Sequence, residues 1–64
     1  MKKVKILIQE RGPVAEFEKK IQDFINEQDE NGKYLYNVHD IKYSITYDEG
    51  YDDYTYSVLI IYDD

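Results

Sequence analysis

The sequence predicts an α+β domain of βαββ order, in which a three-stranded antiparallel sheet carries one helix on one face. Three patterns indicate it. Residues 3–9 alternate between apolar and polar side chains, as a half-buried strand does. From residue 14, apolar side chains recur every three or four positions, the spacing of an amphipathic helix. Residues 41–46 and 54–62 are rich in β-branched and aromatic side chains, so two further strands follow the helix.

Turn-forming residues bound the predicted helix. Gly12 is a tolerable N-cap, and Pro13 suits the first helical position because its missing N–H costs nothing there. We expect the helix to end near Gln28, where residues 31–32, Asn-Gly, supply the positive φ angles that close a helix. Residues 34–38 fit either an extended loop or the ragged start of the next strand.

The third strand is apolar on both of its faces. Val58 and Ile60 alternate along it with Leu59 and Ile61. A central strand has this composition, because it is covered on both sides. We therefore expect it between the other two strands, which gives the strand order 2-3-1 and a wholly antiparallel sheet.

The two later strands form a hairpin whose register can be derived. Pairing Tyr47 with Tyr54 makes one face apolar or aromatic and sets threonine against threonine and serine against serine on the other. A slip of one residue would mix these faces. The connection is either a type II′ turn at residues 50–51 or a wider loop over residues 48–53, which relieves opposed acidic side chains. The residues expected to face the helix are Ile41, Tyr43, Ile45, Tyr56, Val58 and Ile60.

The first strand is expected to bury its more apolar face. The side chains on that face are Val4, Ile6 and Ile8. Leu7 would then lie on the open face of the sheet, beside Leu59 and Ile61. Exposed aliphatic groups invite a partner or a second copy, and a core of this size rarely supplies more than about 3–5 kcal/mol. We therefore expect a homo-oligomer that uses Leu7, Leu59 and Ile61.

Length and composition limit the functions that the chain can have. Its 64 residues make one domain, residues 1–64, without cysteine for a disulfide or a thiolate metal site. The apolar run at residues 6–8 is too short for a signal-peptide core or a membrane span, so a cytoplasmic location is expected.

Catalytic groups are sparse. Ser44 and Ser57 are the candidate nucleophiles and His39 is the only imidazole. Neighbouring His39 and Asp40 point to opposite faces of an extended strand, so no serine–histidine–aspartate arrangement is expected. One Gly-Pro pair before the helix is too little for a phosphate cradle. The sequence therefore predicts no enzymatic activity, no cofactor and no metal.

Charge is divided unevenly along the chain. Residues 1–20 carry six basic and three acidic side chains, whereas residues 21–64 carry two basic and eleven acidic ones and all eight tyrosines. This balance argues against direct binding to nucleic acids or anionic membranes, because lysine and arginine drive binding to phosphates. It favours a basic protein partner, although a net charge also keeps a small domain in solution.

Four carboxylates concentrate between the two later strands. A calcium site is the least supported interpretation, because the ligand spacing of a calcium loop is missing. A solvated hairpin tip and a contact surface remain. Carboxylates interleaved with tyrosines resemble a strip of phosphates and stacked rings, a surface suited to an arginine-rich groove. The expected partner-binding residues are Tyr47, Asp48, Glu49, Tyr51, Asp52, Asp53 and Tyr54.

Three strand-like segments carry a resemblance to a known family. KVKILI at residues 3–8, DIKYSI at 40–45 and YSVLIIY at 56–62 resemble very small sporulation-associated proteins of Gram-positive bacteria, which have related copies in phages. The family implies no activity or binding residues. In size, charge and tyrosine content the chain also resembles, by type, phage-encoded anti-CRISPR inhibitors, which block nucleic-acid-binding enzymes by imitating their ligand.

Two functions of different class follow from these observations. The first is a small inhibitor that docks its acidic, tyrosine-rich edge on a basic nucleic-acid channel, such as that of a CRISPR nuclease. The alternative is a sporulation-associated structural or regulatory protein that acts through self-association. The first predicts binding that weakens with salt, and the second predicts oligomers that are indifferent to salt.

Overall fold

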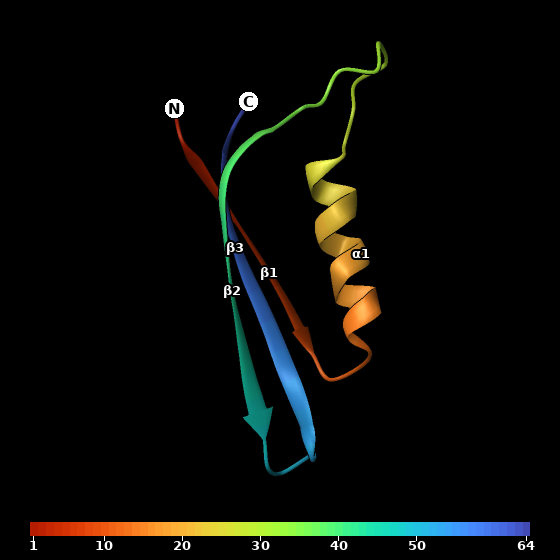
Figure 1. Ribbon diagram of the computed structural model, residues 1–64, viewed down its shortest axis with the longest axis vertical. Helices are drawn as coiled ribbons and strands as arrows, with labels where there is room; N and C mark the ends of the chain where they lie inside the picture. Colours follow the sequence, from red (N-terminus) through yellow and green to blue (C-terminus); the bar gives the residue numbers. More distant parts are fainter.

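The computed structural model describes all 64 residues as one sheet and one helix. Its elements are β1 (Lys3–Glu10), α1 (Val14–Ile25), β2 (Asn37–Asp48) and β3 (Asp53–Asp63). The antiparallel strands lie in the order β1-β3-β2, and α1 runs beside them (Figure 1). The predicted α+β fold, its βαββ order and the central place of the third strand are confirmed. No helix has the length and hydrophobicity that crossing a bilayer requires.

The hairpin of β2 and β3 has the predicted register. Tyr47 pairs with Tyr54, Tyr43 with Val58, and threonine and serine pairs alternate with them on the other face. The register shifts only near the start of β2, where His39 forms a bulge. Strand β2 therefore begins at Asn37 and includes the end of the segment that the sequence left ambiguous.

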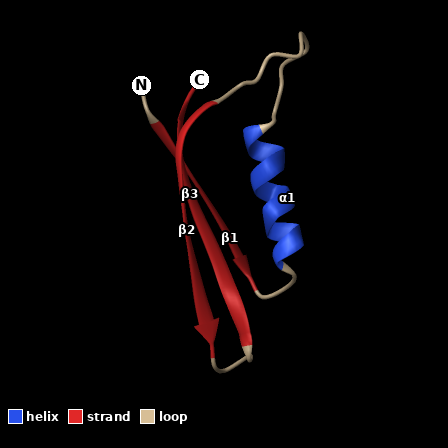
Figure 2. Cartoon of the chain, in the orientation of Figure 1, coloured by secondary structure: helices blue, strands red, loops and turns tan.

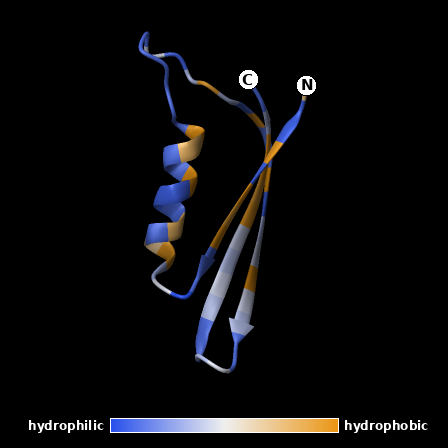
Figure 3. Cartoon of the chain, turned by 180° about the vertical axis from the view of Figure 1, so that it is seen from behind, coloured by the Kyte–Doolittle hydropathy of each residue, from blue (hydrophilic) through white to orange (hydrophobic).

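The core is small and lies between α1 and β3. Its buried hydrophobic residues are Phe17, Val58 and Ile60, and the Phe17 ring stacks on Tyr56 with the centroids 5.8 Å apart. The hydrophobic side chains around them are only partly buried: Leu7, Ile21, Phe24, Ile25, Val38, Tyr56 and Tyr62. Figure 3 shows apolar residues in the middle of β1 and β3 and along α1, whereas the hairpin end is hydrophilic.

Three aromatic rings pack together between the C-terminal end of α1, the connection that follows it and β3. Phe24 stacks on Tyr36 at 4.4 Å between centroids, and both rings meet the edge of Tyr62, at 5.2 and 5.0 Å. Each such pair adds about 0.5–1.5 kcal/mol beyond the area that it buries. This cluster ties the long connection after α1 to the last turn of the helix.

Strand β1 is turned the opposite way from the expectation. Leu7 pairs with Val58, which faces the helix, so Leu7 packs against the core and does not lie on the open face. The open face of β1 instead carries Val4, Ile6 and Ile8, which are 56%, 60% and 59% exposed. The expected placement of all four residues was therefore wrong. Alternation defines two faces of a strand, but the register with β3 decides which face meets the helix.

Two polar side chains of β1 lie on the same face as Leu7 and reach the helix. The Gln9 amide donates to the Pro13 carbonyl at 3.1 Å, and the Lys5 ammonium lies 5.9 Å from the centre of the Phe24 ring. Gln9 is buried, and its Oε1 atom accepts no hydrogen bond. The sequence pattern assigned Lys5 and Gln9 to solvent, but the stems of both side chains cover apolar surface beside the helix.

The turn into α1 differs from the expectation by one position. Pro13 is the N-cap, with φ of −71° and ψ of 139°, and Val14 is the first helical residue. The expected cap, Gly12, lies in the tight turn before it, with φ of +108°. A Cβ at Gly12 would also come within 3.3 Å of the Gln9 amide nitrogen. Glycine is therefore required for the turn and not for the cap.

The helix ends at Ile25, three residues earlier than expected. Gln28 pairs with Tyr34 in an isolated bridge instead of continuing the helix. The Asp29 carboxylate closes the turn between them, because its Oδ1 accepts the Asn31 N–H at 2.8 Å. Such a side-chain bond to the backbone competes with helical hydrogen bonds.

A matched pair of isoleucines tests the position of the core. Ile60→Val removes a buried methylene, so we expect the free energy of unfolding to fall by about 0.5–1.5 kcal/mol. Ile45 is about half exposed on the neighbouring strand, so Ile45→Val should change it by less than about 0.5 kcal/mol. Urea denaturation measures both changes. Equal losses in the two variants would contradict the assigned core.

Candidate protein-binding hairpin tip

The end of the β2–β3 hairpin projects beyond the rest of the fold. β1 pairs with β3 only as far as Glu10 and Thr55, whereas β2 continues to pair up to Asp48 and Asp53. Figure 2 shows that the hairpin extends past the turn between β1 and α1. We call residues 47–54 the hairpin tip. All seven side chains that were predicted to bind a partner lie in it.

The tip closes with the wider of the two expected loops. β2 ends at Asp48 and β3 begins at Asp53, and the Tyr51 N–H donates to the Asp48 carbonyl at 3.3 Å. The residue with positive φ is Asp52, at +51°, and not Gly50. A type II′ turn needs that conformation at its first central residue, so it does not form here. Aspartate tolerates the left-handed region because its short side chain bonds locally.

Two of the four tip carboxylates hold the backbone of the loop. Asp48 Oδ1 accepts the Gly50 N–H at 3.0 Å, and Asp53 Oδ1 accepts the Tyr54 N–H at 2.7 Å. These bonds offset the repulsion expected between the directly opposed Asp48 and Asp53. Glu49 is exposed and its carboxylate accepts no hydrogen bond within the chain. The loop is therefore ordered by its own acidic residues.

The tyrosines of the tip are fixed but half exposed. The Tyr47 hydroxyl donates to the Asp52 carboxylate, and this bond raises the pKa of Tyr47. The rings of Tyr47 and Tyr54 lie 5.3 Å apart between centroids. Tyr47, Tyr51 and Tyr54 are 47%, 62% and 46% exposed. The tip thus presents aromatic surface whose orientation is set before any partner binds.

Arg11 packs against the hairpin tip, although sequence reasoning did not include it in the candidate site. Its guanidinium lies over the Tyr51 ring, 3.8 Å from the centroid, and its backbone N–H donates to the Tyr54 carbonyl at 3.0 Å. The predicted strand order could have placed Arg11 beside this hairpin. An antiparallel neighbour of the third strand ends beside the start of that strand, and Arg11 follows the first strand directly.

An exposed apolar strip continues from the tip along β2. Tyr43 is 74% exposed, because α1 covers β1 and β3 and leaves the helix side of β2 open. A groove of about 290 Å³ lies between α1 and β2, with Val14, Ile21 and Ile41 among its lining residues. The sequence pattern placed Ile41 and Tyr43 on the face against the helix, yet Ile41, Tyr43 and Val14 remain substantially exposed.

The imidazole lies at the opposite end of the sheet. His39 Nε2 is 2.5 Å from Asp63 Oδ2, and this hydrogen bond lowers the pKa of Asp63. Nearby, Lys3 and Asp64 form an ion pair of 2.8 Å that joins the two ends of the chain. Five residues of extended strand, about 17 Å, separate His39 from Ser44. No three His, Cys, Asp or Glu side chains are grouped so that they could hold a metal ion.

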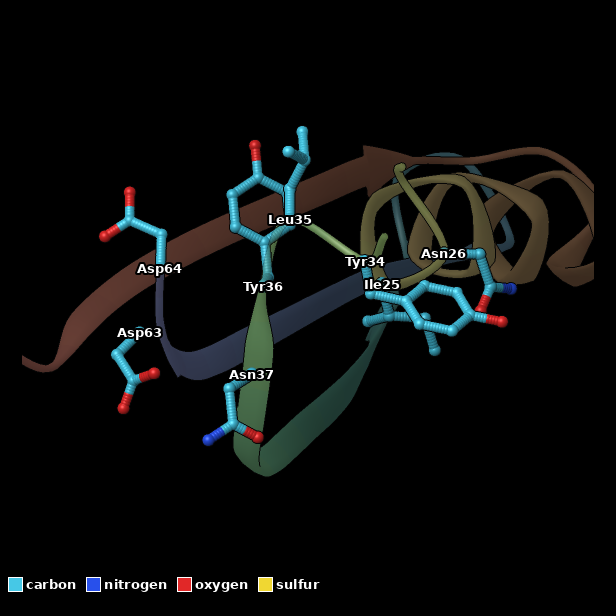
Figure 4. A pocket seen from close by; sticks show the side chains of 8 residues that line it. All are labelled: Ile25, Asn26, Tyr34, Leu35, Tyr36, Asn37, Asp63 and Asp64. Atoms are coloured by element: carbon cyan, nitrogen blue, oxygen red, sulfur yellow. The ribbon is translucent and has the colours of Figure 1, made fainter. Parts of the chain in front are cut away.

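The largest hollow, of about 510 Å³, lies at the same end (Figure 4). Tyr34, Ile25 and Asn26 line one part of it, and the two C-terminal aspartates lie on the other side. It is wide open, and Asp63 and Asp64 are already paired with His39 and Lys3. The hollow therefore lacks the converging polar groups that mark a small-molecule site.

Neither a protein-family model nor a curated protein nor a solved structure matches this chain.

The titration of Tyr47 tests the ordering of the tip. Because the pKa of Tyr47 is raised in the folded chain, the stabilisation that its protonated hydroxyl contributes is fully present below about pH 10. It is lost as the pH rises through the folded pKa. Asp52→Asn should lower the pKa of Tyr47, because a neutral acceptor holds the proton less strongly. Ultraviolet absorbance of tyrosinate measures the change. Tyr47 should titrate at a lower pH in the variant than in the native chain, whereas the pKa of Tyr36, which burial and Glu27 raise, should not change.

Glu49→Gln is the matched control for this titration. The Glu49 carboxylate is in the same loop but does not bond to Tyr47, so removing it should leave the tyrosine titration curve unchanged. Identical curves for the native chain and Asp52→Asn would contradict the hydrogen bond.

Proposed function

We propose that the chain is a small protein-binding module that docks its acidic, tyrosine-rich hairpin tip on a basic surface of the kind that binds nucleic-acid phosphates. By occupying such a surface, for example the channel of a CRISPR nuclease in the cytoplasm, it acts as an inhibitor. The single observation that carries the proposal is the projection of this tip, with half-exposed tyrosines and carboxylates together, beyond the helix and β1.

Preorganisation of the tip supports this role. The loop is held by the Asp48–Gly50 and Asp53–Tyr54 hydrogen bonds, and the Tyr47 ring is fixed through Asp52. Side chains and loops that are ordered before binding lose less entropy when the partner arrives. A tip held in one conformation therefore spends less of its contact energy on ordering itself.

The carboxylates keep capacity for a partner. An ionised carboxylate offers about four lone-pair positions, and Asp48 and Asp53 use only part of them on backbone N–H groups. The remaining positions suit the planar fork of a guanidinium, which binds carboxylates and phosphates by the same geometry. A row of such groups is thus a chemical substitute for a row of phosphates.

Arg11 supplies an internal example of the contact. Its guanidinium carbon lies over the Tyr51 ring, 3.8 Å from the centroid. Contacts of this kind contribute about 0.5–1 kcal/mol at exposed sites and more when water is excluded. An arginine of a partner could use the faces of Tyr47 and Tyr54 in the same way, because both rings remain about half exposed.

Neutralising the tip should weaken binding without unfolding the chain. The test variant combines Asp48→Asn, Glu49→Gln, Asp52→Asn and Asp53→Asn. Asparagine oxygens still accept the loop hydrogen bonds and mutual repulsion falls, so each change should alter stability by less than about 0.5 kcal/mol. Binding to an oligoarginine peptide, measured by calorimetry at low salt, should weaken by about tenfold or more, equivalent to about 1.4 kcal/mol.

A charge-matched variant separates the tip from net charge. Glu16→Gln, Glu18→Gln, Asp23→Asn and Glu30→Gln remove the same four charges from other parts of the chain. This control should keep most of the peptide affinity, and Tyr51→Ala should lose part of it. An equal loss in both fourfold variants would show that the peptide senses only total charge, and the proposed docking site would then be wrong.

A second candidate function is a structural or regulatory role, such as one in sporulation, exerted through self-association. The observation in its favour is the open face of the sheet, where Val4, Ile6 and Ile8 are more than half exposed. Leu59 and Ile61 lie beside them, whereas Leu7, on the helix side, does not contribute. Salt distinguishes the candidates, because apolar association resists salt and charge-driven docking does not.

A further inference from the structure

The open face of the sheet is divided into an apolar and a charged flank. In one row across the strands, Ile61 of the central strand β3 lies between Val4 of β1 and Asp40 of β2. The next row on this face has the same composition with the charge reversed. It consists of Ile6, Leu59 and Lys42. Two neighbouring rows thus carry matching aliphatic pairs and opposite charges.

Neither charge of these rows has an ion-pair partner in the chain. The two ion pairs present are Lys3–Asp64 and His39–Asp63. Asp40 accepts only the N–H of the residue after it, and Lys42 makes no side-chain hydrogen bond. Both side chains are exposed. An acid and a base separated by two strand positions are therefore free to meet a surface with the same pair in reverse order.

We propose that a second copy of this chain packs on the open face, related by a two-fold axis that crosses the strands midway between these two rows. Such an axis exchanges the rows. It places the partner's Ile6 over Val4, the partner's Leu59 over Ile61 and the partner's Lys42 over Asp40. A two-fold interface must be complementary to itself, and these rows satisfy that condition for both the aliphatic and the charged side chains.

The area of the overlap allows only a weak dimer. The axis crosses β3 at Ile60, so the two copies lie opposite each other only over residues 57–63 of this strand. Three strands about 4.8 Å apart and about seven residues of about 3.3 Å each give roughly 330 Å² per copy. Two stacked copies bury roughly 670 Å², less than the area of about 1,000 Å² at which stable interfaces begin, so the complementary rows and not the area favour a second copy. Two sheets that pack face to face in this way form an ordinary sandwich core, about 10 Å thick.

The groove between α1 and β2 is a poorer site for a second copy. Its charged lining residue is Glu18 alone, so a two-fold contact there would place like charges together without a basic counterpart. The open face also has a shallow hollow of about 320 Å³ beside Ile6, Leu59 and Lys42. The exchange of rows directs the partner's Ile61 towards this hollow.

Charge reversal tests the arrangement. This proposal deepens the second candidate function and does not depend on the hairpin tip. In sedimentation equilibrium the mass of the native chain should rise towards twice that of one chain as the concentration increases. Asp40→Lys and Lys42→Asp should each raise the dimer dissociation constant by about tenfold or more, because each places like charges across the interface twice. The double variant restores both pairs in reverse and should return to within about threefold of the native constant.

Two apolar variants on opposite faces serve as the matched control. Ile6→Lys should give monomers, while Tyr43→Lys, on the helix side of β2, should leave the dimer intact. Circular dichroism shows whether each variant is folded, and the exposed charge variants remain decisive if Ile6→Lys unfolds. A dimer that Tyr43→Lys dissociates, or that neither charge reversal weakens, overturns this interface but keeps self-association. A native chain that is monomeric at every concentration overturns both.

Discussion

Antiparallel pairing of β3 along both of its edges determines where the other groups of the molecule lie. Its alternating side chains divide the sheet into a face with Val58 and Ile60 and a face with Leu59 and Ile61. A single helix of twelve residues can cover only one of these faces, and only the part above β1 and β3. The exposed open face, the groove beside β2 and the free hairpin tip are all consequences of that shortage of helical cover.

The strand order and hairpin register could be predicted from the sequence because each depends on local patterns. β3 is apolar at consecutive positions, and only one register matches serine with serine and threonine with threonine. The orientation of β1 could not be predicted in this way. Its aliphatic side chains lie on the open face, while Leu7 faces the helix with long polar neighbours whose stems cover apolar surface. Hydrophobic alternation separates the two faces of a strand, but it does not determine which of them meets the helix.

The composition of the hairpin tip was also visible in the sequence, but its internal bonding was not. Opposed aspartates suggested repulsion, whereas Asp48 and Asp53 use their carboxylates as acceptors for the backbone of the loop. The position of Arg11 over Tyr51 depends on strand pairing between residues forty positions apart. The early end of α1 depends on the Asp29 turn, which propensity does not distinguish from a continued helix.

The two proposed surfaces have a joint geometric consequence. The two-fold axis lies about seven strand residues, or 23 Å, from Asp53, and it reverses the strand direction of the second copy. The two hairpin tips would therefore point away from each other, about 50 Å apart. A single basic groove that accepts one tip could not reach the other, so the dimer would join two partner molecules instead of clamping one. Avidity would then arise only for partners that are themselves linked or clustered.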